Sequence, residues 1–226
     1  MKRLLVLPFY EKENIISQKL EEIELMNLDA DILFVDDGSS DSTASKIKTG
    51  GRIYLISHEV SLGYGGCFQS AISFAENNYD EIIFSDLSHP KFCTAAEKII
   101  SLLTESQFVS LSRIRKNEED REYAVFKLSN SVTAKLNSSA DIDIADPFSP
   151  FKGFKTEILS NMILEEFDES LLLQLWIQSA HFKIAFREEY FDGIACRTLT
   201  DAEQLENDLE HYIAFIEGEI LLYPPE

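Results

Sequence analysis

The sequence predicts an α/β protein whose mostly parallel sheet is flanked by helices. In the first half of the chain, short apolar runs alternate with stretches whose apolar residues recur at helical spacing. This pattern is typical of right-handed βαβ crossovers. Polar and glycine-containing segments follow the apolar runs, as loops do at the ends of parallel strands. The 226 residues, 45% hydrophobic and 27% charged, suffice for one large domain with a substantial core.

Each predicted strand is a short apolar run rich in β-branched or aromatic residues. In chain order these runs are Leu4–Leu7, Ile32–Val35, Ile53–Ile56, Ile82–Phe84 and Phe108–Leu111. Between them, apolar residues at helical spacing predict amphipathic helices. The approximate helical ranges are residues 15–23, 65–77 and 92–103.

The second half of the chain is predicted to be mostly helical. A helix is expected over about 120–136, followed by an acidic, proline-containing loop over 141–153. Two helical stretches then end near Ala180, a strand is expected within 181–190, and a last helix with one apolar face covers about 199–216. Because no repeat or linker interrupts the chain, we expect a single domain.

The chain is strongly acidic, with 20 basic and 40 acidic residues giving a formal net charge of −20. A field of that sign repels nucleic acid and anionic lipid, so we expect no nucleic-acid partner. The N-terminus is basic and then apolar, like a signal peptide, but its apolar part is short and ends in Pro8-Phe9-Tyr10. No apolar run approaches the roughly 20 residues that span a bilayer. We therefore expect a cytoplasmic protein without a transmembrane segment.

The cysteines and most histidines show no metal-binding pattern in the sequence. Cys67, Cys93 and Cys196 are odd in number and widely spaced, with no CxxC pair. This argues against a disulfide framework and a zinc site, and suits a reducing compartment. His58 is one of three scattered histidines without metal-ligand spacing, and we expect it to be structural.

Polar segments that could bind a ligand or take part in a reaction follow three of the predicted strands. They are VDDGSSDST over 35–43, SLGYGG over 61–66 and DLSHP over 86–90. Asp36 and Asp37 could accept hydrogen bonds from a base or a ribose, and the glycines could let the backbone approach a phosphate or sugar. Each segment is also typical of a capped βα turn. The glycine turn matches neither the dinucleotide fingerprint nor the P-loop.

In this order, the segments resemble the motifs of family 2 glycosyltransferases. Residues 8–15 are similar to that family's opening Pro-x-Tyr-Asn-Glu segment, and 34–43 to its V-D-D-G-S-x-D-x-T. Residues 61–66 resemble its N-x-G-x-G-x turn, and 86–90 the end of its D-A-D-x-Q-H-P segment. The most similar branch is the dolichol-phosphate mannose synthase type, in which a nucleotide sugar donates its sugar to a lipid phosphate.

The resemblance implies a GT-A fold, a Rossmann-like sheet that binds a nucleoside diphosphate sugar. It is strong over residues 3–113 and thinner to about 190. A single GT-A domain would then cover residues 1–226. Its first half, to about 113, would bind the nucleotide sugar, and residues 114–226 would form the acceptor side.

The resemblance also implies roles for individual residues, by their positions in the motifs. The residues implied to bind the donor are Pro8, Tyr10 and Asp36 at the base and ribose, Asp37 in support, Gly63 and Gly65 at the glycine turn, and Asp86 as the second carboxylate of the metal-binding D-x-D. The residues implied near the phosphates and the acceptor are Arg113, Lys127 and Asp146. The basic run Arg113–Lys116 is equally typical of a solvated loop.

Three departures from the family's motifs bear on the mechanism. Phe84 stands where the first D-x-D carboxylate would be, and Lys12 and Ser61 replace two further polar residues. Asp86 with His89 would make a poor Mg²⁺ site, although an imidazole suits Mn²⁺ better. We expect one of three outcomes: weakened binding of a divalent cation, its replacement by the cationic side chains of Lys12, Arg113 and Lys127, or loss of catalysis.

Together these features predict an inverting glycosyltransferase that uses a nucleoside diphosphate sugar. Its acceptor is not identified by the sequence, and polyprenyl phosphate is one candidate. For a hydroxyl acceptor, Asp146 is the candidate base. A lipid phosphate needs no base but must be reached peripherally, at the inner face of the membrane, which the net charge of −20 opposes.

Two other functions are alternatives to sugar transfer. A nucleotide-sugar-binding protein without turnover is favoured by the combined changes at Lys12, Ser61 and Phe84. A sugar nucleotidyltransferase would require a glycine-rich loop with an arginine after the first strand. The sequence Pro8-Phe9-Tyr10-Glu11 at that place argues against it.

Overall fold

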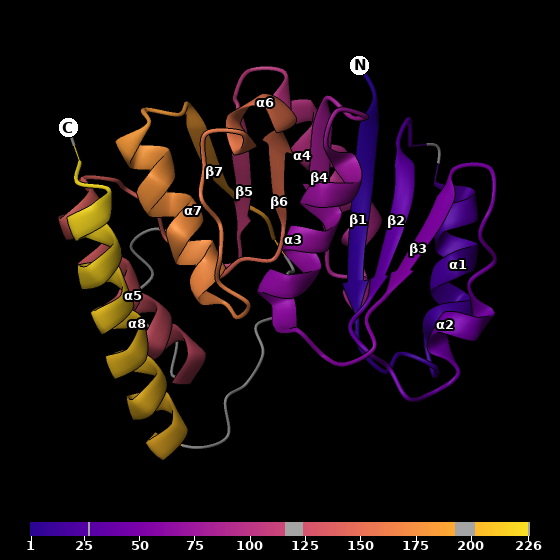
Figure 1. The fold of residues 1–226 in the computed structure, drawn as a ribbon, viewed down its shortest axis with the longest axis horizontal. Coiled ribbons are helices and arrows are strands. Elements are labelled where there is room, and N and C mark those ends of the chain that lie inside the picture. The colour runs from indigo at the N-terminus through magenta and orange to yellow at the C-terminus, as the bar shows by residue number, and fades with distance from the viewer. Residues whose placement is uncertain (27, 116–123, 193–201, 226) are drawn as a thin grey trace.

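The structure is a computed structural model that describes residues 1–26, 28–115, 124–192 and 202–225. Its centre is a seven-stranded sheet with helices on both faces (Figure 1). The strands, in the spatial order β3-β2-β1-β4-β6-β5-β7, are β3 (Ile53–Ser57), β2 (Asp31–Asp36), β1 (Arg3–Phe9), β4 (Glu81–Phe84), β6 (Lys152–Lys155), β5 (Phe108–Ser112) and β7 (Phe186–Tyr190). Among these strands β6 alone runs antiparallel to its neighbours, so the prediction of a mostly parallel sheet is confirmed.

Two helical layers cover the sheet. The longer helices are α1 (Ile16–Leu25), α3 (Gly63–Ala75), α4 (Phe92–Leu103), α5 (Ala124–Ala140), α7 (Ser170–His181) and α8 (Ala202–Leu222), and the short ones are α2 (Thr43–Lys46) and α6 (Thr156–Leu159). Apolar residues of α3, α5, α7 and α8 share one core cluster with the sheet, and those of α1 and α4 share the other. No helix among the described residues is long and apolar enough to cross a bilayer.

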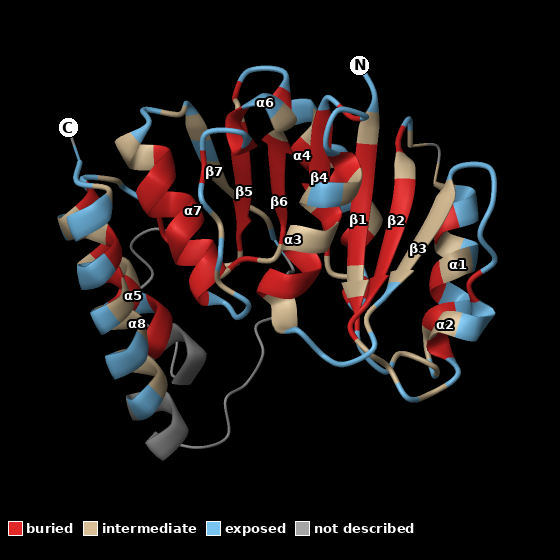
Figure 2. Cartoon of the chain, in the orientation of Figure 1, coloured by how far each residue is buried: buried red, intermediate tan, exposed pale blue. Residues whose placement is uncertain are grey.

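The core follows from alternation along the central strands. In β1, Leu4 and Val6 face the first cluster, whereas Leu5 and Leu7 face the second, as the period of a strand requires. The central strands are buried along most of their length, while the edge strands β3 and β7 are only partly covered (Figure 2). Trp176 is fully buried in the first cluster.

Two predictions in the second half differ from the structure in their bounds. Residues 152–155 form the interior strand β6, although the predicted loop extended to Gly153 and no strand was predicted here. Its two lysines and glycine give no sign of a strand in the sequence. The Cβ that Gly153 lacks would lie 2.2 Å from Ile99 Cγ2, so the glycine lets α4 approach the sheet. The predicted strand within 181–190 begins only at Phe186, because α7 continues to His181 and Lys183 then turns the chain with a φ of 52°.

The predicted first-half helices and strands agree with the structure to within a few residues. Near the chain's middle, the predicted helix over 120–136 corresponds to α5, although 120–123 lie outside the described residues. The predicted last helix corresponds to α8, which extends to Leu222. Strands from both halves of the chain share the one sheet.

Candidate active site

The candidate residues gather at the carboxyl ends of the parallel strands. Asp36 ends β2, and Tyr10, Asp86 and Arg113 directly follow β1, β4 and β5 or lie within two residues of them. Because β6 is antiparallel, its first residue, Lys152, lies at the same edge. One edge of the sheet therefore carries nearly all the side chains that the sequence singled out.

The first two motifs are joined by hydrogen bonds. Asp36 is 3% exposed, and its Oδ1 accepts a hydrogen bond of 3.0 Å from the Ser39 amide. The Glu11 amide in turn donates to Ser39 Oγ at 2.9 Å. Pro8 is half-buried in β1, and Tyr10 is 49% exposed beyond its end. Tyr10 thus offers an accessible ring beside the buried end of β2.

Asp37 connects the second motif to the glycine turn through hydrogen bonds. Its carboxylate accepts hydrogen bonds from the Ser61 hydroxyl at 2.6 Å, from the Leu62 and Gly63 amides at 2.8 and 3.0 Å, and from His58 Nδ1 at 2.9 Å. Burial opposes ionisation, but the hydrogen bonds from Ser61 and His58 outweigh it and lower the pKa of Asp37. Its oxygens therefore face the protein's own donors.

The glycine turn makes room for another segment of the chain. Gly63 has a φ of +78°, and the Cβ it lacks would lie 2.5 Å from the Phe167 carbonyl oxygen. At Gly65 a Cβ would lie 2.2 Å from the Glu166 carbonyl oxygen, and the Gly65 amide donates to the Phe167 carbonyl at 2.8 Å. The two glycines thus allow residues 166–167 to lie directly against the start of α3.

Phe84, at the first position of the expected D-x-D, belongs to the core. Its fully buried ring stacks on Phe68 with centroids 4.1 Å apart and meets Phe154 edge-on. Asp86 is half-buried and accepts a hydrogen bond from the Ser88 amide. His89 is buried, and its Nδ1 accepts a hydrogen bond of 3.0 Å from the Lys91 amide. Within the described residues, Asp86 and His89 belong to no cluster of three potential metal ligands.

Arg113 and Asp146 form a buried two-point ion pair. Arg113 Nε lies 2.7 Å from Asp146 Oδ2, Nη2 lies 2.8 Å from Oδ1, and the Arg113 amide also donates to Oδ2. Asp146 is fully buried, and despite that burial the Arg113 charge lowers its pKa. Glu188, from β7, accepts hydrogen bonds from the Ala145 and Asp146 amides and so fixes the backbone behind the pair.

Lys152 is a member of this cluster that the sequence did not reveal. It is fully buried, with Nζ 3.0 Å from Ser110 Oγ and 5.1 Å from the centre of the Trp176 ring. Burial lowers its pKa to about 7, and the negative charges of Asp146 and Glu188 limit the drop. A lysine in a short polar segment gives no signal of burial in the sequence. Lys127 lies in the first turn of α5, where side chains are outside the described residues.

We expect the free energy of unfolding to rise between pH 7 and pH 9 by an amount that Lys152→Met removes. In the folded chain the pKa of Lys152 is about 7, below its unfolded value, so the unfolded chain binds more protons over this range. The largest slope is about a tenfold change in the folding equilibrium constant per pH unit. Urea denaturation across this range measures it, with the half-buried Lys155→Met as control. An unchanged slope in Lys152→Met would contradict the prediction.

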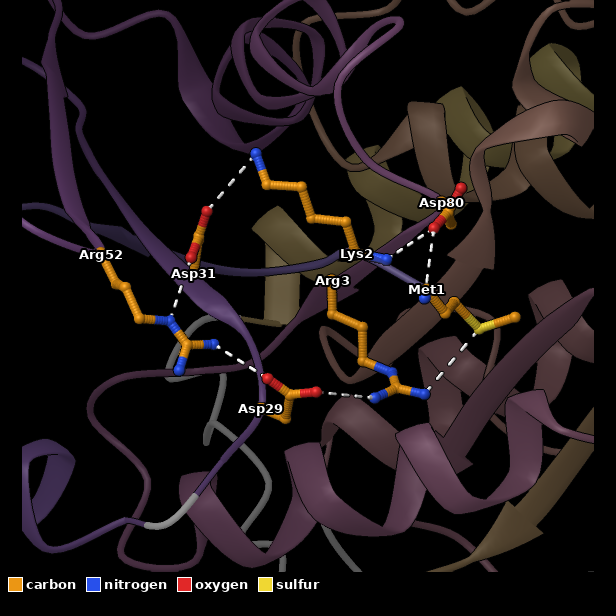
Figure 3. A pocket seen from close by; sticks show the side chains of 7 residues that line it. All are labelled: Met1, Lys2, Arg3, Asp29, Asp31, Arg52 and Asp80. Atoms are coloured by element: carbon orange, nitrogen blue, oxygen red, sulfur yellow. Dashed lines mark hydrogen bonds and ion pairs between the residues drawn. The ribbon is translucent and has the colours of Figure 1, made fainter.

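A pocket at the opposite end of the strands, where the parallel strands begin, is lined mostly by charged side chains (Figure 3). It is closed by ion pairs such as Arg52 Nε to Asp31 Oδ1 at 3.1 Å and Arg3 Nη1 to Asp29 Oδ2 at 3.9 Å. These groups begin the strands and carry none of the motifs. Exposed pairs of this kind contribute little to stability.

The model of glycosyl transferase family 2 matches residues 4–163, more than half of the chain. The chain belongs to glycosyl transferase family 2. At the level of the family, this confirms the resemblance found in the motifs. The dolichol-phosphate mannose synthase branch stays a prediction. No curated protein sequence matches this family 2 member.

Solved structures with the same fold include glucosyl-3-phosphoglycerate synthase from Mycobacterium tuberculosis. Its complex with uridine diphosphate has a TM-score of 0.69 and 16% identity to this family 2 chain, and the match covers 96% of this chain and 79% of the synthase. Its complex with Mn²⁺, UDP-glucose and phosphoglyceric acid has a TM-score of 0.68 and 14% identity, with coverages of 96% and 79%. The likeness confirms the expected GT-A fold.

Proposed function

We propose that this family 2 protein binds a nucleoside diphosphate sugar at the carboxyl edge of the sheet and transfers its sugar with inversion. The observation that carries the proposal is the convergence of Tyr10, Asp36, Asp86 and Arg113 on that edge. The synthase of similar fold has been solved with UDP-glucose and with phosphoglyceric acid. A UDP-sugar donor and a phosphate-bearing acceptor are therefore the first to test, with polyprenyl phosphate as the lipid candidate.

In the proposed mechanism, Arg113 supplies positive charge to the leaving diphosphate. Inversion requires in-line attack by the acceptor oxygen while charge develops on the departing phosphates. Arg113 is mostly buried and held at two points by Asp146, so its guanidinium is oriented before substrate binds. Pre-oriented charge of this kind costs little reorganisation during reaction.

Asp146 has two candidate roles in this mechanism. The sequence proposed it as a base for a hydroxyl acceptor. Both of its oxygens accept hydrogen bonds from Arg113, and its pKa is lowered, which favours a positioning role over proton abstraction. A phosphate acceptor, which is ionised without help, would need no base, and this agrees with a positioning role.

The residues after β4 do not fit a divalent cation well. Phe84 offers no ligand atom, and the Nδ1 of His89 already accepts a hydrogen bond from the Lys91 amide. Asp86 alone supplies a carboxylate, whereas Mg²⁺ and Mn²⁺ favour several oxygen ligands. No step of the proposed mechanism therefore uses a metal ion. The same observation favours the second candidate function, a nucleotide-sugar-binding protein without turnover.

We expect calorimetric titration to show UDP-glucose binding that differs less than threefold with and without added Mn²⁺. Asp36→Asn should weaken that binding at least tenfold, because the carboxylate is proposed to hold the base or ribose. Asp29→Asn, at the far edge of the sheet, is the matched control. Strong dependence on Mn²⁺ would contradict the metal-free mechanism, and unchanged binding by Asp36→Asn would contradict its role.

Turnover separates the two candidate functions. Release of UDP should be followed with phosphoglycerate and with polyprenyl phosphate in detergent as acceptors. Transfer to either would support the proposed enzyme. Binding of UDP- or GDP-sugars without transfer to any acceptor would favour the binding protein, and no binding at all would contradict both.

A further inference from the structure

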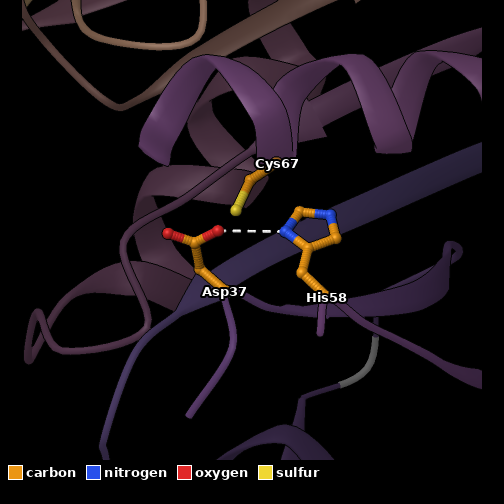
Figure 4. A group of neighbouring side chains, drawn as sticks. All are labelled: Asp37, His58 and Cys67. Carbon is orange, nitrogen blue, oxygen red and sulfur yellow. Dashed lines mark hydrogen bonds and ion pairs between the residues drawn. The ribbon is translucent and has the colours of Figure 1, made fainter. Parts of the chain in front are cut away.

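A cluster of three potential metal ligands lies beside the proposed donor site. Asp37 follows β2, His58 follows β3, and Cys67 belongs to the second turn of α3 (Figure 4). One carboxylate oxygen, one imidazole nitrogen and the sulfur all lie within 4.8 Å of one another. The side chains of His58 and Asp37 are 7% and 11% exposed, and Cys67 is 2% exposed. The three side chains are therefore almost completely enclosed.

We propose that Asp37, His58 and Cys67 bind a zinc ion. Carboxylate oxygen, imidazole nitrogen and thiolate sulfur are the three ligand types that zinc takes in proteins. Tetrahedral zinc with bond lengths of about 2.0–2.3 Å places neighbouring ligand atoms roughly 3.3–3.6 Å apart. Asp37 Oδ1 and His58 Nδ1 are 2.9 Å apart, so a slight separation of these two and a small approach of Cys67 complete the arrangement. Water takes the fourth position.

The charges of the cluster suit a divalent ion in a buried place. One carboxylate and one thiolate balance the two positive charges of zinc, so the bound cluster is neutral. A carboxylate oxygen can only accept, so in its hydrogen bond with Asp37 the Nδ1 of His58 carries the proton before the metal binds. On binding, that proton moves to Nε2 and the Cys67 thiol loses its own, so each zinc ion releases one proton to solvent.

The surroundings already hold the ligands as zinc sites usually do. His58 Nε2 lies 2.9 Å from Ser70 Oγ, which can accept the proton that Nε2 carries once Nδ1 is bound to metal. The second oxygen of Asp37 is held by the Ser61 hydroxyl and the Gly63 amide. Such hydrogen bonds fix the orientation of metal-bound imidazoles and carboxylates.

Burial makes other uses of Cys67 less suitable. Burial and the neighbouring Asp37 raise the pKa of its thiol, so it is not a reactive thiolate in the metal-free chain. Metal binding is the chemistry that deprotonates such a thiol. The ion would tie the ends of β2 and β3 to α3, and so brace two of the loops around the proposed donor site.

The test uses a chain in which Cys67 is the one remaining thiol, made by Cys93→Ser and Cys196→Ser. We expect one zinc ion per chain by elemental analysis after reloading, and a higher melting temperature with zinc than with EDTA. Cobalt should give a thiolate-to-metal charge-transfer band in the near ultraviolet. In Cys67→Ala and in His58→Gln we expect loss of the band and of the zinc-dependent stabilisation.

Controls separate this site from other metal binding. Asp86→Asn should keep both the cobalt band and the stabilisation, because it removes the carboxylate of the reaction site and leaves the cluster intact. Circular dichroism of the metal-free variants verifies that they are folded. Absence of the band in the single-thiol chain, or its persistence in folded Cys67→Ala, would overturn the proposal. Neither result depends on whether a nucleotide sugar binds.

Discussion

Phe84→Asp, which would recreate the paired carboxylates of the family's motif, is expected to destabilise the fold by about 3 kcal/mol or more. The change removes an aromatic ring that stacks on Phe68 and meets Phe154 edge-on, and it puts a carboxylate into an apolar layer. The residue paired with position 84 on β6 is Lys152, whose ammonium group already donates a hydrogen bond to Ser110. We expect no gain in Mn²⁺ affinity, since the position faces the core.

Urea denaturation and Mn²⁺ titration of this variant measure the two effects. Phe84→Leu is the matched control, because it keeps an apolar side chain and should cost less than Phe84→Asp. Equal stability of the two variants, together with tighter Mn²⁺ binding by the aspartate, would show that position 84 reaches the reaction site.

Asp146→Asn is expected to cost about 3–5 kcal/mol of stability, the usual result of breaking a buried ion pair at one partner. The amide has nearly the same shape, so packing is kept while Arg113 loses its counter-charge and the buried Lys152 loses a neighbouring negative charge. We also expect the variant to lose more affinity for nucleoside diphosphates than for nucleosides, because Arg113 would no longer be held in place to contact the phosphates.

The control for this variant is Glu189→Gln in β7. Its partners, Lys98 and Arg187, are partly exposed, so the loss should stay below about 1 kcal/mol. Adding Arg113→Met to Asp146→Asn should recover part of the stability, since the mostly buried Arg113 charge that lacks its partner is then removed as well. A loss below about 1 kcal/mol in Asp146→Asn would contradict the importance of the pair.

Periodicity predicts those elements in which each face is either buried or exposed along its whole length. In β1 and β2, apolar residues cover both faces, and in α4 they cover one, so the strands and helices of the first half are visible in the sequence. By contrast, β6 consists of two lysines, a glycine and a phenylalanine. Its place is decided by the two strands beside it and by the space that Gly153 leaves for α4, which are properties of the assembled sheet.

In the candidate site, too, the local motifs could be predicted from the sequence, whereas contacts between distant segments could not. The motifs near Asp36 and Gly63 are local, and so are visible along the chain. That Arg113 pairs with Asp146 depends on contact across 33 residues of sequence. Likewise, the spacing of the cysteines argued against zinc, yet the fold brings Cys67 to a carboxylate and an imidazole from two other segments.

The antiparallel strand β6 also limits how the chain can vary in length. Asp146 lies six positions before Lys152, which is locked between β4 and β5 by ladders on both sides. One inserted residue between them would either shift Asp146 away from Arg113 or turn every side chain of β6 to the opposite face. Length changes in relatives are therefore expected outside this short connection.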